Sequence, residues 1–297
     1  MESINKLLPG IKKNISLKDY TTFKIGGRAK YFYVAKTKTE LINAVITAKK
    51  TNMPFFILGG GSNLLISDKG FSGLVIKTLN TEYQILNTKI VAETGTTLGQ
   101  LVIASATAGL TGLEWAAGIP GTVGGAVFGN AGWLNNKKNI SSTIESVEVL
   151  EIKPKSKSKI RNYTLKDCNF SYRDSIFKRR KNLVILSISL KLKKGNKKRI
   201  KKEISYILRE RKEKIPMGFS AGSIFKNPKG FSAGQLVEKC GLKGKKIGGT
   251  EISEKHANFI INSGNARAKD VEKLINLAKK EVKNKFRIKL EEEIQIL

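Results

Sequence analysis

The sequence predicts an α+β fold divided into two domains. The chain has 297 residues, and a single domain usually has about 100 to 200. Its apolar residues change repeatedly between a period of two, typical of strands, and a period of 3.6, typical of helices. These segments do not follow the strict βαβ order of a doubly wound parallel sheet. We therefore expect one domain over residues 1–194 and a smaller α+β domain over residues 195–297.

Two helices are expected in the first domain. Thr37 and Glu40 have the spacing of a capping box, and the apolar residues that follow as far as Ala48 lie at helical intervals. Residues 98–108 also place their apolar side chains on one helical face, and Gly109 stands where a C-terminal cap belongs. The two patterns predict helices that each bury one side.

Strands are indicated in three places in the same domain. Residues 54–58 form a short apolar run that ends in glycine, and residues 147–152 and 184–192 alternate with a period of two. The first domain is therefore expected to contain appreciable sheet.

A lysine-rich polar stretch at residues 193–202 marks the expected boundary near Lys194. After it we expect a helix whose apolar face includes Ile200, Ile204, Ile207 and Leu208, a strand at 256–262, a helix at 270–283 and a final strand at 286–297.

Two glycine-rich segments are candidates for phosphate binding. Residues 59–63, Gly-Gly-Gly-Ser-Asn, directly follow the first strand, so their N–H groups can form a concave nest for an anion. Leu64 stands where a Rossmann fingerprint needs its third glycine, so a nucleotide would be bound in another way. Residues 109–132 contain eight glycines in 24 residues, which we interpret as close turns without regular helix or strand, and Gly118–Ala126 within them is the second candidate loop.

The composition excludes several classes of protein. No apolar run approaches the roughly 18 residues of a membrane span, residues 1–14 lack the apolar core of a secretory signal, and Cys168 and Cys240 form no disulfide framework. A cytoplasmic protein is expected.

The formal charge of +31 would suit an anionic partner, but the basic residues are spread along the chain, and the dense runs at 153–161 and 191–214 lack interleaved aromatics. Charge alone therefore identifies no partner.

Six motifs of the chain can be compared with those of known families: Thr21–Gly27, Leu58–Leu65, Gly118–Ala126, Phe170–Ser175, Ser220–Pro228 and Lys255–Asn262. Together they resemble the UDP-N-acetylenolpyruvoylglucosamine reductase family, which acts in peptidoglycan precursor synthesis. They occur in the family's order over about residues 16–296, and the Ala-Gly-Ser-x-Phe-Lys-Asn-Pro motif is the most specific. The short form of the family, which lacks an inserted loop in the second domain, is the more similar.

The resemblance implies an FAD-binding domain of the p-cresol methylhydroxylase/vanillyl-alcohol oxidase type, followed by a substrate domain. It implies non-covalent FAD, NADPH as the hydride donor, and reduction of the enolpyruvyl ether of UDP-N-acetylglucosamine to UDP-N-acetylmuramate. No nucleic acid or membrane partner is expected. The residues implied to bind the cofactor are Gly59, Gly60, Gly61, Ser62, Asn63, Gly118, Ile119, Pro120, Gly121, Gly124, Gly125 and Ala126.

Three residues match the family's catalytic positions. Arg173 is implied to neutralise the substrate carboxylate, for which a guanidinium is well suited, and Ser223 to donate a proton. Glu293 matches the second carboxylate of the terminal Leu-Glu-x-Glu pattern, and Glu291 is the fallback on the same face. The positions implied to contact the substrate are Tyr172, Lys214 and Asn227.

Other residues are expected to have structural roles or differ from the family's usual residues. His256 is expected to be structural, and the two cysteines are expected to be buried small residues without a metal cluster. Trp133-Leu134-Asn135 and Phe219 depart from the family's usual residues, and residues 153–160 are interpreted as a surface hairpin extension.

Two alternative functions remain at this stage. An oxidase or dehydrogenase of a hydroxy acid or a sugar could use the same FAD-binding fold. A basic nucleic-acid-binding protein without catalysis would also be consistent with the charge.

Overall fold

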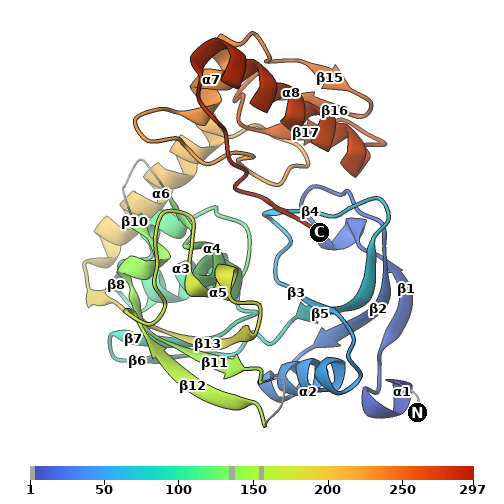
Figure 1. The fold of residues 1–297 in the computed structure, drawn as a ribbon. Coiled ribbons are helices and arrows are strands. Elements are labelled where there is room, and N and C mark those ends of the chain that lie inside the picture. Colours follow the sequence, from blue (N-terminus) through green and yellow to red (C-terminus); the bar gives the residue numbers. More distant parts are fainter. Residues whose placement is uncertain (1–3, 134–137, 154–156) are drawn as a thin grey trace. The chain divides into compact units, whose positions relative to one another are not determined.

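The computed structural model describes residues 4–133, 138–153 and 157–297, and it separates into two compact units (Figure 1). Unit 1 comprises residues 1–12, 32–60 and 73–210, and unit 2 comprises residues 13–31, 61–72 and 211–297. Both units are discontinuous in sequence, whereas the expected domains, 1–194 and 195–297, are each one continuous segment. The chain passes between the units within the glycine turn, after Gly60.

Unit 1 contains a five-stranded antiparallel sheet with the order β12-β11-β13-β7-β6. The expected strands at 147–152 and 184–192 are confirmed as β11 and β13, which pair with each other. The strands are β6 (Tyr83–Leu86), β7 (Lys89–Glu93), β11 (Ile144–Glu151), β12 (Lys159–Thr164) and β13 (Leu183–Lys191).

A second sheet has the order β1-β2-β5-β3, and its β3 and β5 are parallel. The expected strand at 54–58 is confirmed as β3, which leads directly into the glycine turn. The strands of this sheet are β1 (Lys12–Ser16), β2 (Arg28–Ala35), β3 (Phe55–Leu58) and β5 (Phe71–Thr78).

The two helices expected in the first domain are confirmed. Helix α2 (Lys38–Lys50) is capped by Thr37, whose side chain accepts a hydrogen bond from the Glu40 N–H. Helix α3 (Leu98–Thr107) has a complete capping box at Thr97, and Gly109 follows it with a φ of +70°. The buried face of α3 joins a core that includes the fully buried Trp115.

The expectation of turns alone over residues 109–132 is wrong, because α4 (Val123–Gly129) lies within them. Thr122 caps this helix by accepting a hydrogen bond from the Gly125 N–H, and Val123 and Val127 are fully buried. A Cβ at Gly124 would lie 1.8 Å from Oγ1 of Thr94, so glycine is needed there for packing. Capping and burial therefore outweigh the low helical propensity of glycine.

Helix α6 (Lys197–Lys214) confirms the helix expected after the polar stretch, although its polar beginning is itself helical. Ile200 and Ile207 are buried, whereas Leu208 is exposed, so the expected apolar face is narrower than its sequence pattern. The remaining short elements outside unit 2 are α1 (Ile4–Leu7), β8 (Leu110–Thr111), β9 (Gly132–Trp133), β10 (Lys138–Asn139), α5 (Ile176–Arg179) and β14 (Lys193–Lys194).

Unit 2 has its own core, against which α8 (Ala268–Phe286) places the inward face expected from the sequence. The strand expected at 256–262 is limited to β17. The expected final strand at 286–297 is wrong for most of its length, because α8 continues to Phe286, Arg287 is left-handed, and only the end forms β18. The other elements are β4 (Leu64–Leu65), α7 (Ala233–Lys239), β15 (Lys246–Ile247), β16 (Thr250–Ile252), β17 (Ile260–Asn262) and β18 (Gln295–Ile296).

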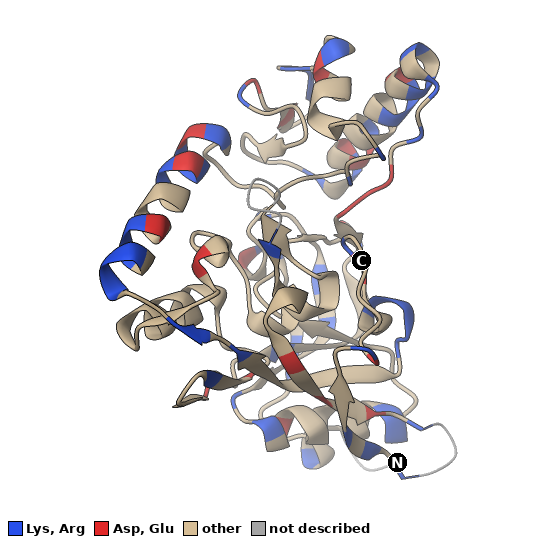
Figure 2. Ribbon diagram, turned by 90° about the vertical axis from the view of Figure 1, so that its left-hand side faces the viewer, with Lys and Arg blue, Asp and Glu red and all other residues tan. Residues whose placement is uncertain are grey.

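Lysine and arginine occur in helices, strands and loops of both units (Figure 2). Within the described part of the chain, no helix has the length and apolarity that crossing a membrane requires. Leu134 and Asn135 of the family departure, and residues 154–156 of the expected hairpin extension, lie outside the described residues.

Candidate functional site

The first glycine turn packs directly against the second in unit 1. A Cβ added at Gly60 would lie 2.6 Å from Cα of Gly121, and one added at Gly59 would lie 2.7 Å from Oγ1 of Thr122. Any larger residue would therefore separate the two turns. Gly121 is fixed in turn by its carbonyl, which accepts a hydrogen bond from the Leu98 N–H at the start of α3 at 3.1 Å.

Backbone N–H groups are available where the two turns meet. Among the described residues, the N–H groups of Gly59, Gly60 and Gly121 donate to no protein acceptor. Such groups suit phosphate oxygens, which accept several hydrogen bonds at once. Gly118 has a φ of +72° and is exposed, so the second turn presents bare backbone. The residues present therefore fit a cofactor that contains a diphosphate.

Arg173 lies on a tight turn of unit 1 with a φ of +54°. Its Nη2 donates to the carbonyl of Gly132 at 3.0 Å, and its guanidinium lies 5.7 Å from the ring centre of Tyr172. Asn130, at the end of α4, donates through Nδ2 to the carbonyl of Ser171 at 2.8 Å. The turn that carries Arg173 is thus anchored to the helix that follows the second glycine turn.

Ser223 lies in a loop of unit 2 that is held to the end of the first glycine segment. Thr22 makes this link, because its Oγ1 donates to the carbonyl of Ser220 at 2.7 Å and its N–H donates to the carbonyl of Gly61 at 3.2 Å. A Cβ at Gly222 would lie 3.9 Å from the carbonyl oxygen of Ser62. The candidate proton donor and the Ser62 backbone are therefore neighbours within one unit.

Glu293 belongs to the same part of unit 2. Its N–H donates to the carbonyl of Ile224 at 2.8 Å, and its carbonyl accepts a hydrogen bond from Nδ2 of Asn63 at 3.1 Å. The C-terminal segment thus runs beside the Ser223 loop on one side and the glycine segment on the other. The structure brings Ser223, Glu293 and Asn63 together.

The neighbouring glutamates are engaged elsewhere. The exposed Glu291 forms an ion pair with Lys226 at 3.6 Å, and Glu292 forms one with Lys279 at 2.8 Å. Desolvation by burial acts to raise the pKa of Glu292, but the hydrogen bonds and charge of Lys279 outweigh it and leave that pKa lowered. Glu293 is thus the member of the acidic run whose backbone is joined to both candidate site segments.

The three residues expected to contact the substrate lie in separate segments of the chain. Tyr172 is exposed beside Arg173, and Lys214 is exposed at the end of α6. Asn227 accepts a hydrogen bond from the Ala233 N–H at 2.9 Å through its Oδ1, which fixes its side chain at the start of α7. A substrate role for these residues stays a prediction.

His256 is held within unit 2 by its own surroundings. Its Nδ1 accepts a hydrogen bond from the Asn258 N–H at 3.2 Å, and its ring packs edge-on against Phe259 with centroids 5.0 Å apart. Burial lowers the pKa of the imidazole. These contacts are consistent with the expected structural role.

Cys168 is buried as expected, whereas Cys240 is only partly buried. Burial raises the pKa of the Cys168 thiol to about 12, so this cysteine is poorly suited to act as a thiolate nucleophile. The described residues contain no group of three or more His, Cys, Asp or Glu side chains arranged to hold a metal.

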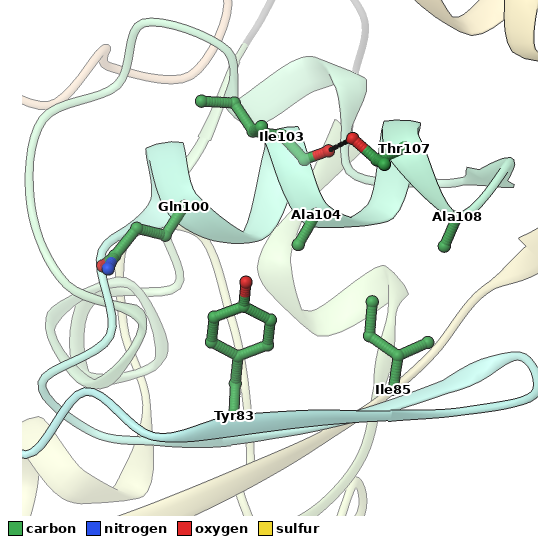
Figure 3. A pocket seen from close by; sticks show the side chains of 7 residues that line it. All are labelled: Tyr83, Ile85, Gln100, Ile103, Ala104, Thr107 and Ala108. Atoms are coloured by element: carbon green, nitrogen blue, oxygen red, sulfur yellow. Dashed lines mark hydrogen bonds between the residues drawn. The ribbon is translucent and has the colours of Figure 1, made fainter.

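Two surface depressions lie elsewhere in the units. One of about 460 Å³ is lined by β6 and α3, including Tyr83, Ile85 and Ile103 (Figure 3). The other, of about 680 Å³, is lined by residues that include Lys13, Arg28, Lys30 and Asp68. Neither is lined by a predicted site residue, so the candidate site rests on the hydrogen bonds described above.

Sequence reasoning assigned no role to Thr22, Thr122 or Asn130. Thr22 lies in one of the quoted motifs, and Thr122 directly precedes a helix, so both had a local signal. Asn130 is identifiable only in the structure, where its φ of +44° and its bond to Ser171 become visible.

Comparisons with known proteins match both parts of the chain. A family model described as UDP-N-acetylenolpyruvoylglucosamine reductase, C-terminal domain, matches residues 214–297, and one described as FAD binding domain matches residues 29–153. The UDP-N-acetylenolpyruvoylglucosamine reductase of Clostridium novyi is 42% identical over 97% of this chain and 92% of that protein. The reductase of Lactobacillus acidophilus is 38% identical over 100% of this chain and 99% of that protein. The crystal structure of the reductase from Thermus caldophilus has a TM-score of 0.81 and 37% identity, and covers 96% of this chain and 99% of that one.

Proposed function

The chain belongs to the UDP-N-acetylenolpyruvoylglucosamine reductase family, and from this premise we propose how its residues carry out that reaction. It is an FAD-dependent oxidoreductase that reduces the enolpyruvyl ether of UDP-N-acetylglucosamine with NADPH, in peptidoglycan precursor synthesis. A bound FAD would supply the hydride-transfer chemistry that links NADPH to the enolpyruvyl group.

The two glycine turns bind the diphosphate of the cofactor. The N–H groups of Gly59, Gly60 and Gly121 are the donors, and close packing of the turns sets their positions. The remaining cofactor residues named from the family are proposed to line the same molecule. Bare backbone allows the approach that side chains would block.

Arg173 and Ser223 have complementary roles in the reduction. Hydride addition leaves negative charge on the substrate carboxylate, and the guanidinium of Arg173 stabilises it. The neighbouring carbon then needs a proton, which the hydroxyl of Ser223 donates. The turn that holds Arg173 is preorganised by Asn130 and Gly132, so little reorganisation is needed when the substrate binds.

Glu293 is the proposed carboxyl group of the site. The observation that carries this proposal is that Glu293 bonds through its N–H to Ile224, the residue after Ser223, and through its carbonyl to Asn63. Tyr172, Lys214 and Asn227 are proposed to contact the UDP-sugar. Residues 1–194 are proposed to contain the cofactor domain and residues 195–297 the substrate domain, with the reaction taking place in the cytoplasm.

The test is the absorbance spectrum of the purified protein together with NADPH consumption. A bound flavin and NADPH oxidation that depends on the enolpyruvyl nucleotide are expected. Flavin with oxidation of a hydroxy acid or sugar instead would favour the oxidase alternative. A colourless protein that binds DNA with steep salt dependence would favour nucleic-acid binding.

A further inference from the structure

A lysine side chain holds the first glycine turn from the side of the sheet. Lys77 is in β5, directly across from Leu58 in the parallel pairing of β3 and β5. Its Nζ donates to the carbonyl of Gly59 at 2.5 Å. The next residue, Thr78, donates through Oγ1 to the carbonyl of Leu58 at 3.4 Å. Two consecutive side chains of β5 therefore fix two consecutive carbonyls where β3 enters the turn.

The direction of the Gly59 carbonyl determines the direction of the Gly60 N–H. The two groups belong to one planar trans peptide, in which the C=O and N–H bonds point in opposite directions. Because the carbonyl points to Lys77, the N–H points away from Lys77. That N–H donates to no acceptor among the described residues, so it is available to a ligand.

The ammonium group of Lys77 has no ion-pair partner among the described residues. Within the described part of the chain, no carboxylate forms an ion pair with Lys77, and its side chain is only partly exposed. Burial lowers the pKa of this ammonium group. A partly desolvated cation is costly to hold, and a phosphate bound on the other side of the same peptide would offset part of that cost.

We propose that Lys77 is a positioning residue for the diphosphate of FAD. It aims the Gly60 N–H at a phosphate oxygen by holding the Gly59 carbonyl, and its positive charge favours the bound dianion. A cation on the carbonyl also polarises the peptide, which makes the N–H a stronger donor. This inference rests on the proposed function, because it assumes that the turn binds FAD.

The experiment compares FAD binding to four proteins after the flavin has been removed: the parent, Lys77→Met, Lys77→Arg and the control Lys36→Met. Lys36 is an exposed residue of the same unit, so its replacement removes the same charge away from the turn. For Lys77→Met we expect the Kd for FAD to rise by about 10-fold or more, the usual effect of losing a hydrogen bond to a charged group. Lys77→Arg should recover most of the affinity, and Lys36→Met should match the parent.

Riboflavin, which has no phosphate, distinguishes positioning from a general structural role. Its Kd should be the same for the parent and Lys77→Met, and the melting temperatures of the flavin-free proteins should agree. An FAD affinity of Lys77→Met equal to that of Lys36→Met would overturn the inference. Equal losses for FAD and riboflavin would also overturn it, since the turn itself would then be damaged.

Two further results, a variant that does not fold and a parent protein that binds no FAD, can be told apart from these. If Lys77→Met does not fold, Lys77→Gln replaces it, and parental affinity in Lys77→Gln would reject the role of the charge. If the parent itself binds no FAD, the proposed function fails first, and the inference that rests on it fails with it.

Discussion

Asn63 and Glu293, which are 230 residues apart in sequence, are joined by a hydrogen bond from the Asn63 side-chain amide to the Glu293 carbonyl at 3.1 Å. The carbonyl of Asn63 accepts a second bond, from the Gln295 N–H at 3.0 Å, and β4 and β18 continue the contact as a parallel pair. The end of the glycine segment therefore holds the C-terminal segment in place through these hydrogen bonds.

Replacing Asn63 by Ala should weaken the contact between the glycine segment and the C-terminal segment. The backbone bond from Gln295 remains, so we expect a loss of about 1 kcal/mol in the free energy of unfolding, typical of one hydrogen bond. Because Glu293 shifts with its backbone, substrate reduction should slow more than flavin reduction by NADPH. Denaturant unfolding and rapid-mixing kinetics measure the two effects. Equal slowing of both half-reactions would show that the replacement acts through the proposed cofactor contact of Asn63 and not through its bond to Glu293.

Ser223→Ala removes the proposed proton donor without changing the backbone. Flavin reduction by NADPH should proceed at the parental rate, and reduction of the enolpyruvyl nucleotide should fall by about 10² to 10⁴-fold, the usual contribution of a general acid. The first half-reaction is the internal control for folding and flavin binding. Near-parental substrate reduction would exclude Ser223 as the donor.

Glu293→Gln and Glu291→Gln form a matched pair in the same acidic run. We expect Glu293→Gln to slow substrate reduction by about 10² to 10⁴-fold while flavin binding is retained. Glu291 is exposed and pairs with Lys226 at the surface, so its replacement should cost less than about 1 kcal/mol of stability and little activity. If Glu291→Gln is the inactive variant, the fallback residue is the catalytic one.

His256 provides a prediction about pH. Burial lowers the pKa of the folded imidazole below its usual value, about 6.5 in the unfolded chain. As the pH falls through that value, the unfolded chain binds the proton first, so the neutral form stabilises the fold above about pH 6.5 and this stability is lost in acid. His256→Phe cannot titrate and keeps a ring beside Phe259. Between about pH 7.5 and about pH 5.5, the parent should lose more unfolding free energy than His256→Phe, while both keep substantial activity. A large fall in kcat at all pH values would instead indicate a catalytic histidine.

The sequence pattern was sufficient to predict an element where local interactions within that element determine its structure. Helices α2 and α8 have their expected apolar faces buried, and Thr37 and Thr97 cap helices within a few residues. Local hydrogen bonds and periodicity fix these elements, so distant residues add little.

Prediction failed where distant packing decides. Helix α4 forms among glycines because Thr122 caps it and Val123 and Val127 are buried. Gly124 is required there because Thr94 leaves no room for a side chain. Residues 287–294 alternate like a strand, yet they form only an isolated bridge and a few hydrogen bonds with other segments. These join Glu293 to Ile224 and Asn63, and the Glu291 carbonyl to the Lys226 N–H. The contact of Lys77 could not be predicted either, because one lysine in a lysine-rich sequence is not distinguished from the others until the structure places its Nζ on the Gly59 carbonyl.

Gly60→Ala tests whether contact between the two turns is needed for flavin binding. The added methyl group would lie 2.6 Å from Cα of Gly121, and because that neighbour is backbone, the turns must move apart. We expect the purified variant to lose most of its flavin while remaining folded. Gly99→Ala is the control, since a Cβ there meets nothing within 4 Å and lies in helix α3. It should keep its flavin and gain up to about 1 kcal/mol of stability from the higher helical propensity of alanine. Flavin content from the absorbance spectrum, set beside the melting temperature, separates the two variants, and a Gly60→Ala protein with full flavin content would show that the turns bind it without touching.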